Sequence, residues 1–162
     1  MTLAAQRGGW VIFVSIVIAY MLTIVPLPDW GRVARPEWAA LVLIYWCMAA
    51  PHRVGVTIAW LVGLGQDAIQ ATLLGQHALA YAVMAYLVIR LHQRIRVYPL
   101  PQQALIVLML LLLAQVIQAW ISGFVDQPRP GMAYWLPPLV GTLLWPWVFV
   151  LMRGVRRRFS VQ

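Results

Sequence analysis

The sequence predicts an all-α, polytopic membrane protein with six transmembrane helices in one domain. The chain of 162 residues is 63% hydrophobic and only 10% charged, whereas soluble globular domains carry about 25% charged residues. Apolar runs close to the ~20 residues that cross a bilayer as a helix recur along the chain. All twelve basic residues are arginines and stand at the ends of these runs, which is typical of topology signals. We expect residues 1–162 to form a single integral membrane domain.

The first two expected spans cover residues 10–28 and 36–51. The first is longer than most secretory signal cores and no Ala-x-Ala site follows it, which favours an uncleaved span. The second has a core of only fourteen residues, Glu37 to Ala50, which rises ~21 Å as a helix against an apolar layer of ~30 Å. A tilted helix, extension into the flanks, and a re-entrant path stay open for it.

The remaining expected spans cover residues 54–74, 77–93, 101–123 and 132–153. A tight turn at Gly75-Gln76 joins the third and fourth. In the last, Pro137 and Pro138 can occupy the first helical turn, where the missing N–H matters little. Pro146 lies deeper, and we expect it to kink the helix.

The distribution of arginine supports six spans with both termini in the cytoplasm. The inner side then holds Arg7, Arg53, Arg90, Arg94, Arg96, Arg153, Arg156, Arg157 and Arg158. The outer side holds Arg32, Arg35 and Arg129, balanced by Asp29, Glu37 and Asp126. This imbalance follows the positive-inside rule. If the short second run did not span, the arginines of the 90–96 segment would lie opposite the tail.

Asp67 is the exceptional residue of the third span. A carboxylate inside a membrane helix costs roughly 2.5–3.5 kcal/mol on insertion scales unless it is paired. Residues four apart share a helix face, so Asp67 continues a stripe of small residues that lets a second helix approach closely. The stripe comprises Gly55, Ala59, Gly63, Asp67 and Ala71.

We expect Asp67 to face Gln70, Gln115 or Gln118 rather than lipid. One hypothesis is a protonatable site in a transport path, and the other is a buried polar clamp that fixes helix packing. At the outer turn with Gly75, His77 either relays protons or has a structural role, in which it caps the fourth span or hydrogen-bonds across the turn.

Seven arginines are candidates for contact with lipid headgroups, or with a docked cytoplasmic protein. They are Arg90, Arg94, Arg96, Arg153, Arg156, Arg157 and Arg158. We expect no nucleic-acid partner. The single cysteine and the three scattered histidines match no metal-ligand spacing. We find no nucleophile with a base at workable spacing and no cofactor motif, so we expect neither enzymatic activity nor a cofactor.

Short motifs stand in a fixed order along the chain, namely Pro36-Glu-Trp38, Tyr45-Trp46, Pro51-x-Arg53-x-Gly55, Gly63-x-x-x-Asp67, Leu74-Gly75-x-His77-Ala78-Leu79 and Tyr98-Pro99-x-Pro-Gln-Gln103. This ordered set resembles the MreD family of rod shape-determining proteins from Gram-negative bacteria. The resemblance implies an inner-membrane subunit of the elongation machinery that associates with MreC, and through it with MreB, RodA and the elongation transpeptidase. It also implies a fold similar to the substrate-binding components of energy-coupling-factor transporters.

Two functions stay open at this point. The first is a non-catalytic scaffold that presents helix faces to partner membrane proteins and directs peptidoglycan synthesis. The second is a substrate-binding component or permease for a small molecule or lipid, with an outward pocket around Asp67. A closed, packed interior would favour the scaffold, and an open pocket would favour the second function.

Overall fold

The computed structural model describes residues 2–125 and 131–159, and all regular elements in this part are helical. The predicted all-α class is therefore confirmed for the described residues. In chain order the elements are α1 (Thr2–Ile24), α2 (Asp29–Val33), α3 (Trp38–Ala49), α4 (Val56–Gln70), α5 (Gln76–Val97), α6 (Leu100–Phe124), the 3₁₀-helix η1 (Met132–Trp135) and α7 (Leu136–Arg158). Asp126, Arg129 and the side chain of Arg7, which the topology argument used, lie outside the described part.

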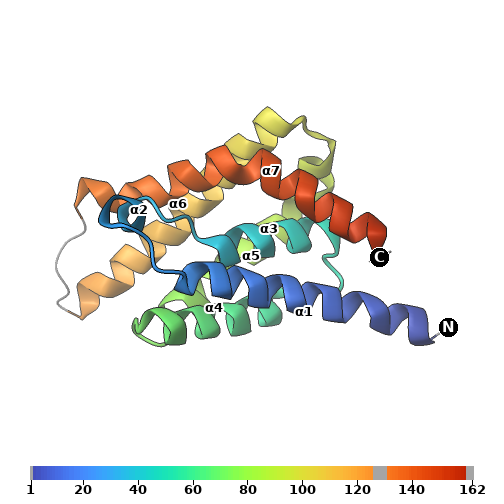
Figure 1. The fold of residues 1–162 in the computed structure, drawn as a ribbon, viewed down its shortest axis with the longest axis horizontal. Helices are drawn as coiled ribbons and strands as arrows, with labels where there is room; N and C mark the ends of the chain where they lie inside the picture. Colours follow the sequence, from blue (N-terminus) through green and yellow to red (C-terminus); the bar gives the residue numbers. More distant parts are fainter. Residues whose placement is uncertain (1, 126–130, 160–162) are drawn as a thin grey trace.

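Among the described residues, two helical segments are long and apolar enough to cross a membrane, namely α6 and Met132–Arg158. The segment Gly8–Ile24 and helix α3 are apolar but shorter. The six-span count and the likeness to energy-coupling-factor components stay predictions. Figure 1 shows the start of α1, the end of α7 and the α5–α6 connection at one end of the molecule, with α2 and the α4–α5 turn at the other.

Helix α3 is the centre of the hydrophobic core. Every residue from Ala39 to Ala49 is buried, and α3 packs against α1, α4, α5 and α7, which surround it in Figure 1. A helix that is apolar on all sides needs such an enclosed position. Its flanks are not helical, so extension of this helix into the flanks, one of the three alternatives, is wrong.

The short helix α3 ends inside the protein, and an arginine from another helix satisfies its last carbonyl groups. Arg96 of α5 donates from Nε to the Met48 oxygen at 2.9 Å and from Nη2 to the Ala49 oxygen at 2.6 Å. The last carbonyls of a helix have no intrahelical partner and carry partial negative charge. Arg35 likewise donates to the carbonyls of Thr23 and Val25 near the end of α1.

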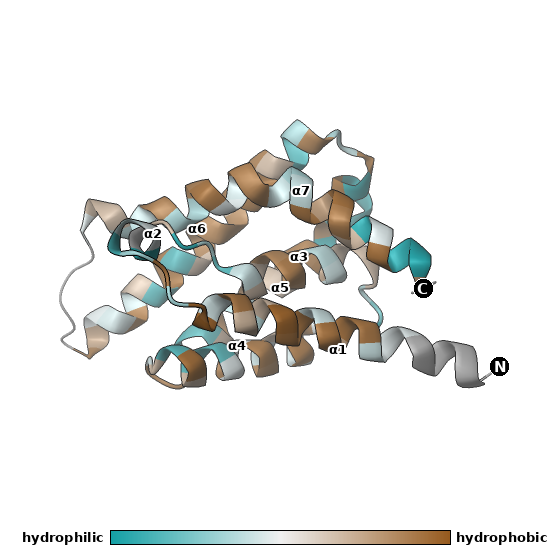
Figure 2. Cartoon of the chain, viewed as in Figure 1, coloured by the Kyte–Doolittle hydropathy of each residue, from teal (hydrophilic) through white to brown (hydrophobic). Residues whose placement is uncertain are grey.

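Several predicted helix ends need correction. Helix α4 ends at Gln70 rather than at 74, because Ala71 takes a left-handed conformation (φ 54°). Helix α5 continues past 93 to Val97. Helix α7 continues through Pro146 to Arg158, so the tail arginines are helical, and Figure 2 shows them as a hydrophilic end on an otherwise mostly apolar helix. The expected kink at Pro146 stays a prediction.

Candidate functional site

The site begins where α4 and α5 touch, at Gly63. A Cβ atom at this position would lie 2.4 Å from the Ala78 Cα and 2.6 Å from the His77 carbonyl oxygen. Both are backbone atoms, so the two helices can come this close only because residue 63 has no side chain. Ala59 and Asp67, one turn to either side, are also buried. This part of the small-residue stripe therefore packs against α5.

Asp67 is fully buried and caps the N-terminus of α5 from the neighbouring helix. Its Oδ1 accepts the backbone N–H of His77 at 2.8 Å, and its Oδ2 accepts the N–H of Gly75 at 2.9 Å and that of Ala78 at 3.4 Å. These are among the donors that have no intrahelical partner at a helix start. The Thr72 hydroxyl donates to Oδ1 at 2.8 Å. Asp67 thus supplies the acceptor that an N-cap side chain normally provides. Gly75, at the N-cap position, has no side chain for this.

The prediction that Asp67 faces a glutamine is wrong. Its hydrogen-bond partners belong to the turn and to the first residues of α5, because the tight turn folds the α5 N-terminus back onto α4. Gln70 is exposed rather than buried. Gln115 and Gln118 are buried on α6, and the Gln118 amide reaches Glu37 instead, at 3.5 Å.

His77 connects Asp67 to a second carboxylate. The His77 Nδ1 lies 2.7 Å from the Asp67 Oδ1, so a hydrogen bond does cross the turn. On the other side of the ring, Nε2 lies 3.8 Å from the Glu37 Oε1. The hydroxyl of the buried Tyr81 donates to the Glu37 Oε2 at 3.1 Å.

Glu37 is the residue of this group that sequence reasoning missed. The charge pattern of the sequence places it in the outer loop, as a counter-charge for arginine. It stands at the N-cap position of α3, where the helix dipole favours negative charge. An acidic residue directly before the most enclosed apolar run was the available signal.

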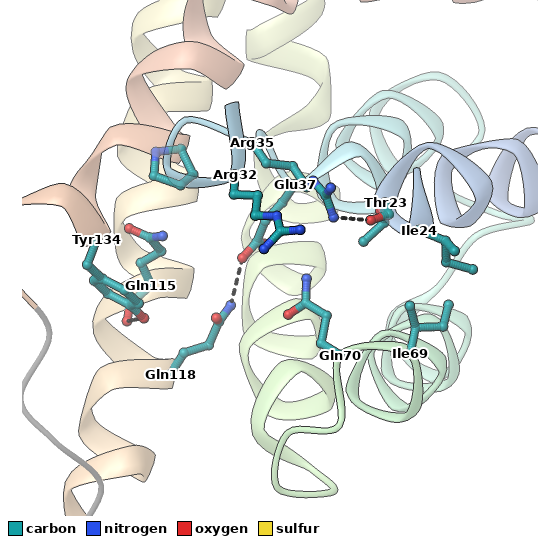
Figure 3. Close-up of a pocket in the computed structure, with 11 residues that line it drawn as sticks. Thr23, Ile24, Arg32, Arg35, Glu37, Ile69, Gln70, Gln115, Gln118 and Tyr134 are labelled. Atoms are coloured by element: carbon teal, nitrogen blue, oxygen red, sulfur yellow. Dashed lines mark hydrogen bonds between the residues drawn. The ribbon is translucent and has the colours of Figure 1, made fainter. Parts of the chain in front are cut away.

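A polar pocket of about 520 Å³ lies beside Glu37 (Figure 3). The three glutamines of the sequence prediction, Gln70, Gln115 and Gln118, all line it, whereas Asp67 and His77 do not. The expected pocket around Asp67 is therefore wrong in its location, because the pocket is lined by Glu37 and not by Asp67. The remaining lining residues include Thr23, Arg32, Arg35 and Tyr134.

Comparison with known proteins decides the family. The family description "rod shape-determining protein MreD" matches residues 5–155. The chain is 31% identical over 148 residues to the rod shape-determining protein MreD of Haemophilus influenzae, with 90% of each chain covered. The chain belongs to the MreD family. No solved structure matches it significantly.

Membership in the MreD family associates this membrane protein with the determination of cell shape. Its buried polar network consists of hydrogen bonds that cap a helix and join α3, α4 and α5. Such a network can hold three helices in one arrangement.

Gln66 provides a test of this view, because it is fully buried and neither atom of its amide has a partner among the described residues. We expect Gln66→Met, which keeps the shape and removes the unpaired polar atoms, to leave the free energy of unfolding in detergent unchanged or to raise it by about 1 kcal/mol. Gln103→Met is the matched control, because the Gln103 Nε2 donates to the carbonyls of Ile95 and Tyr98. It should destabilise the protein, and equal losses in both variants would contradict the account.

Proposed function

We propose that this protein is a non-catalytic, multi-pass scaffold of the rod elongation complex in the bacterial inner membrane. It supports rod shape and lateral peptidoglycan synthesis by binding MreC, and through MreC it acts with MreB, RodA and the elongation transpeptidase. The observation that carries this proposal is the match to the MreD family along nearly the whole chain.

The interior of the α4–α5 hairpin supports a packing role for Asp67. The acceptors of this carboxylate are taken up by backbone and side-chain donors of the same hairpin, so they are engaged within the fold. Gly63 holds the two helices in direct backbone contact. A scaffold needs this kind of rigid framework, because its function is to present helix faces at fixed positions.

Exposed apolar faces supply surfaces for partner helices and lipid. On α6, the side chains of Leu105, Met109 and Trp120 are mostly exposed, and on α7 those of Leu143 and Trp147 are 70% exposed. Large exposed apolar patches mark membrane or protein contact. Such faces are available both to the bilayer and to a transmembrane partner.

The arrangement of the helix ends supports two cytoplasmic termini. The start of α1, the end of α7 and the α5–α6 connection lie at the same end of the molecule (Figure 1). The arginines of the 90–96 segment and of the tail therefore fall on one side, as the positive-inside rule requires.

The pocket beside Glu37 favours a second candidate, a binding component for a small polar molecule. Two buried polar atoms of the residues that line this pocket have no hydrogen-bond partner in the described part of the chain. They are the Arg35 Nε and the Gln115 Oε1. One donor and one acceptor beside a carboxylate could bind a polar ligand. This candidate has no support from the family description.

Affinity purification of the tagged protein from its host in mild detergent, followed by cross-linking mass spectrometry, separates the two candidates. The scaffold predicts recovery of MreC with cross-links to its membrane helix. Recovery of a transporter's ATPase pair without any wall-synthesis partner would overturn the scaffold and favour the binding component. The variant Gly154→Ala is purified in parallel as a control. Its substituted site has open space around it, so it should recover the same partners as the wild type.

A further inference from the structure

Three of the seven arginines singled out in the sequence surround one cavity. A pocket of about 270 Å³ is lined by Arg96 of α5 and by Arg153 and Arg156 of α7, together with Tyr45 of α3 and Gln103 of α6. We call it the arginine pocket. The other four arginines do not line it. Arg90 instead donates to the Tyr86 hydroxyl at 2.7 Å.

The positive charge of the arginine pocket is not balanced by any carboxylate of the described residues that line it. Glu37 stands at the opposite end of α3, and the twelve residues of this helix rise ~18 Å. Arg153 and Arg156 lie three apart on α7 and therefore share one face. Cations gathered around one cavity repel each other unless an anion lies between them.

The donors around the pocket are held in position. Two hydrogen bonds to the end of α3 fix the Arg96 guanidinium, and the Arg156 guanidinium lies beside the Tyr45 hydroxyl. Arg153 is exposed, so the cavity is accessible from outside. Guanidinium groups in such an arrangement match the oxygens of a phosphate group.

Gln103 adds a feature that a bare phosphate would not use. It is only 3% exposed, and its Oε1 has no partner among the described residues. This oxygen accepts hydrogen bonds, so the matching ligand carries a donor such as a hydroxyl next to its phosphate. The glycerol headgroup of an anionic phospholipid has both.

The position of the arginine pocket at the ends of α6 and α7 also fits a lipid headgroup. Gln103 lies in the first turns of α6, and Arg153 and Arg156 lie in the last turns of α7. These two helices belong to the segments long and apolar enough to cross a membrane. Their neighbouring ends therefore lie where phospholipid headgroups are found.

We propose that the arginine pocket is a specific binding site for the phosphate of an anionic phospholipid headgroup. The proposal rests on the membrane placement of the proposed function but not on MreC. Its test uses the isolated protein, so its failure is distinguishable from failure of the MreC pull-down.

The test measures the thermal unfolding midpoint of the full chain in detergent with phosphatidylglycerol, with phosphatidylcholine, and with sodium phosphate at matched ionic strength. Phosphatidylglycerol should raise the midpoint, since a ligand that binds only the folded state stabilises it. Arg153→Gln combined with Arg156→Gln should lose most of this rise. Arg157→Gln combined with Arg158→Gln removes the same charge from the same helix outside the pocket and should keep it.

Each other outcome overturns the proposal. Equal losses in the two double variants would indicate general attraction of anionic lipid to a basic tail. An equal rise with sodium phosphate would indicate a free-phosphate site, and no rise in the wild type would indicate no site. If the Arg153/Arg156 double variant does not fold, the single variant Arg153→Gln is measured by native mass spectrometry, where it must retain fewer phosphatidylglycerol molecules than Arg157→Gln.

Discussion

Gly63→Ala is expected to lower the free energy of unfolding by about 3 kcal/mol, the upper part of the range for overpacked cores. A methyl group at this position would lie 2.4–2.6 Å from backbone atoms of His77 and Ala78, and backbone cannot move aside as a flexible side chain can. The helices α4 and α5 must separate, which also pulls the α5 N-terminus away from Asp67. Unfolding of the purified protein in detergent, followed by circular dichroism, measures the loss.

Gly154→Ala is the matched control for this substitution. Gly154 also lies inside a helix, and a Cβ there would have no atom within 4 Å. Alanine should therefore stabilise the helix by about 0.5–1 kcal/mol. If Gly63→Ala were as stable as Gly154→Ala, the close contact between α4 and α5 would not exist in solution.

Asp67→Leu is expected to cost about 3–5 kcal/mol, the usual loss when one partner of a buried charged network is removed. Leucine would leave the buried N–H group of His77 and the half-buried N–H group of Gly75 without acceptors. Asp67→Asn should cost less, about 1–2 kcal/mol, which is typical of a lost helix cap. Both oxygens of Asp67 accept from N–H groups, so an asparagine must turn its NH₂ group toward a donor.

The structure thus changes the stability expected for Asp67→Asn. From the sequence alone, a packing clamp at Asp67 would tolerate asparagine. The contacts predict a partial loss of stability instead, ordered wild type, asparagine, leucine, in unfolding measurements in detergent. Leucine at least as stable as asparagine would contradict the capping role.

The all-α class was predictable, because recurring apolar runs of nearly 20 residues favour helices. Helix α3 was harder to predict from the sequence. Its length is too short for a bilayer, and only its enclosure by α1, α5 and α7 explains a helix that is apolar on every side. The end of α4 could not be predicted, because it depends on the left-handed conformation of Ala71, and no local sequence pattern indicates that conformation.

The candidate site was predictable in part for a similar reason. Spacing placed Gly63 and Asp67 on one face, because residues on the same helix have a fixed geometry. Partners on other helices could not be predicted in this way. Glu37, which is far from His77 in sequence, meets its ring only in the folded bundle. Arg96, assigned to lipid or to a partner, also caps α3.

The most direct test of a structural role for Asp67 within a scaffold is rescue of rod shape by Asp67→Asn at a matched amount of folded protein. The variant would be expressed in cells without the native protein, and folded protein, recovered MreC and cell width would be measured together. We predict that rod shape and MreC recovery return to wild-type values once the folded amounts are equal. Round cells despite equal folded protein and equal MreC would contradict the account and indicate proton chemistry at Asp67.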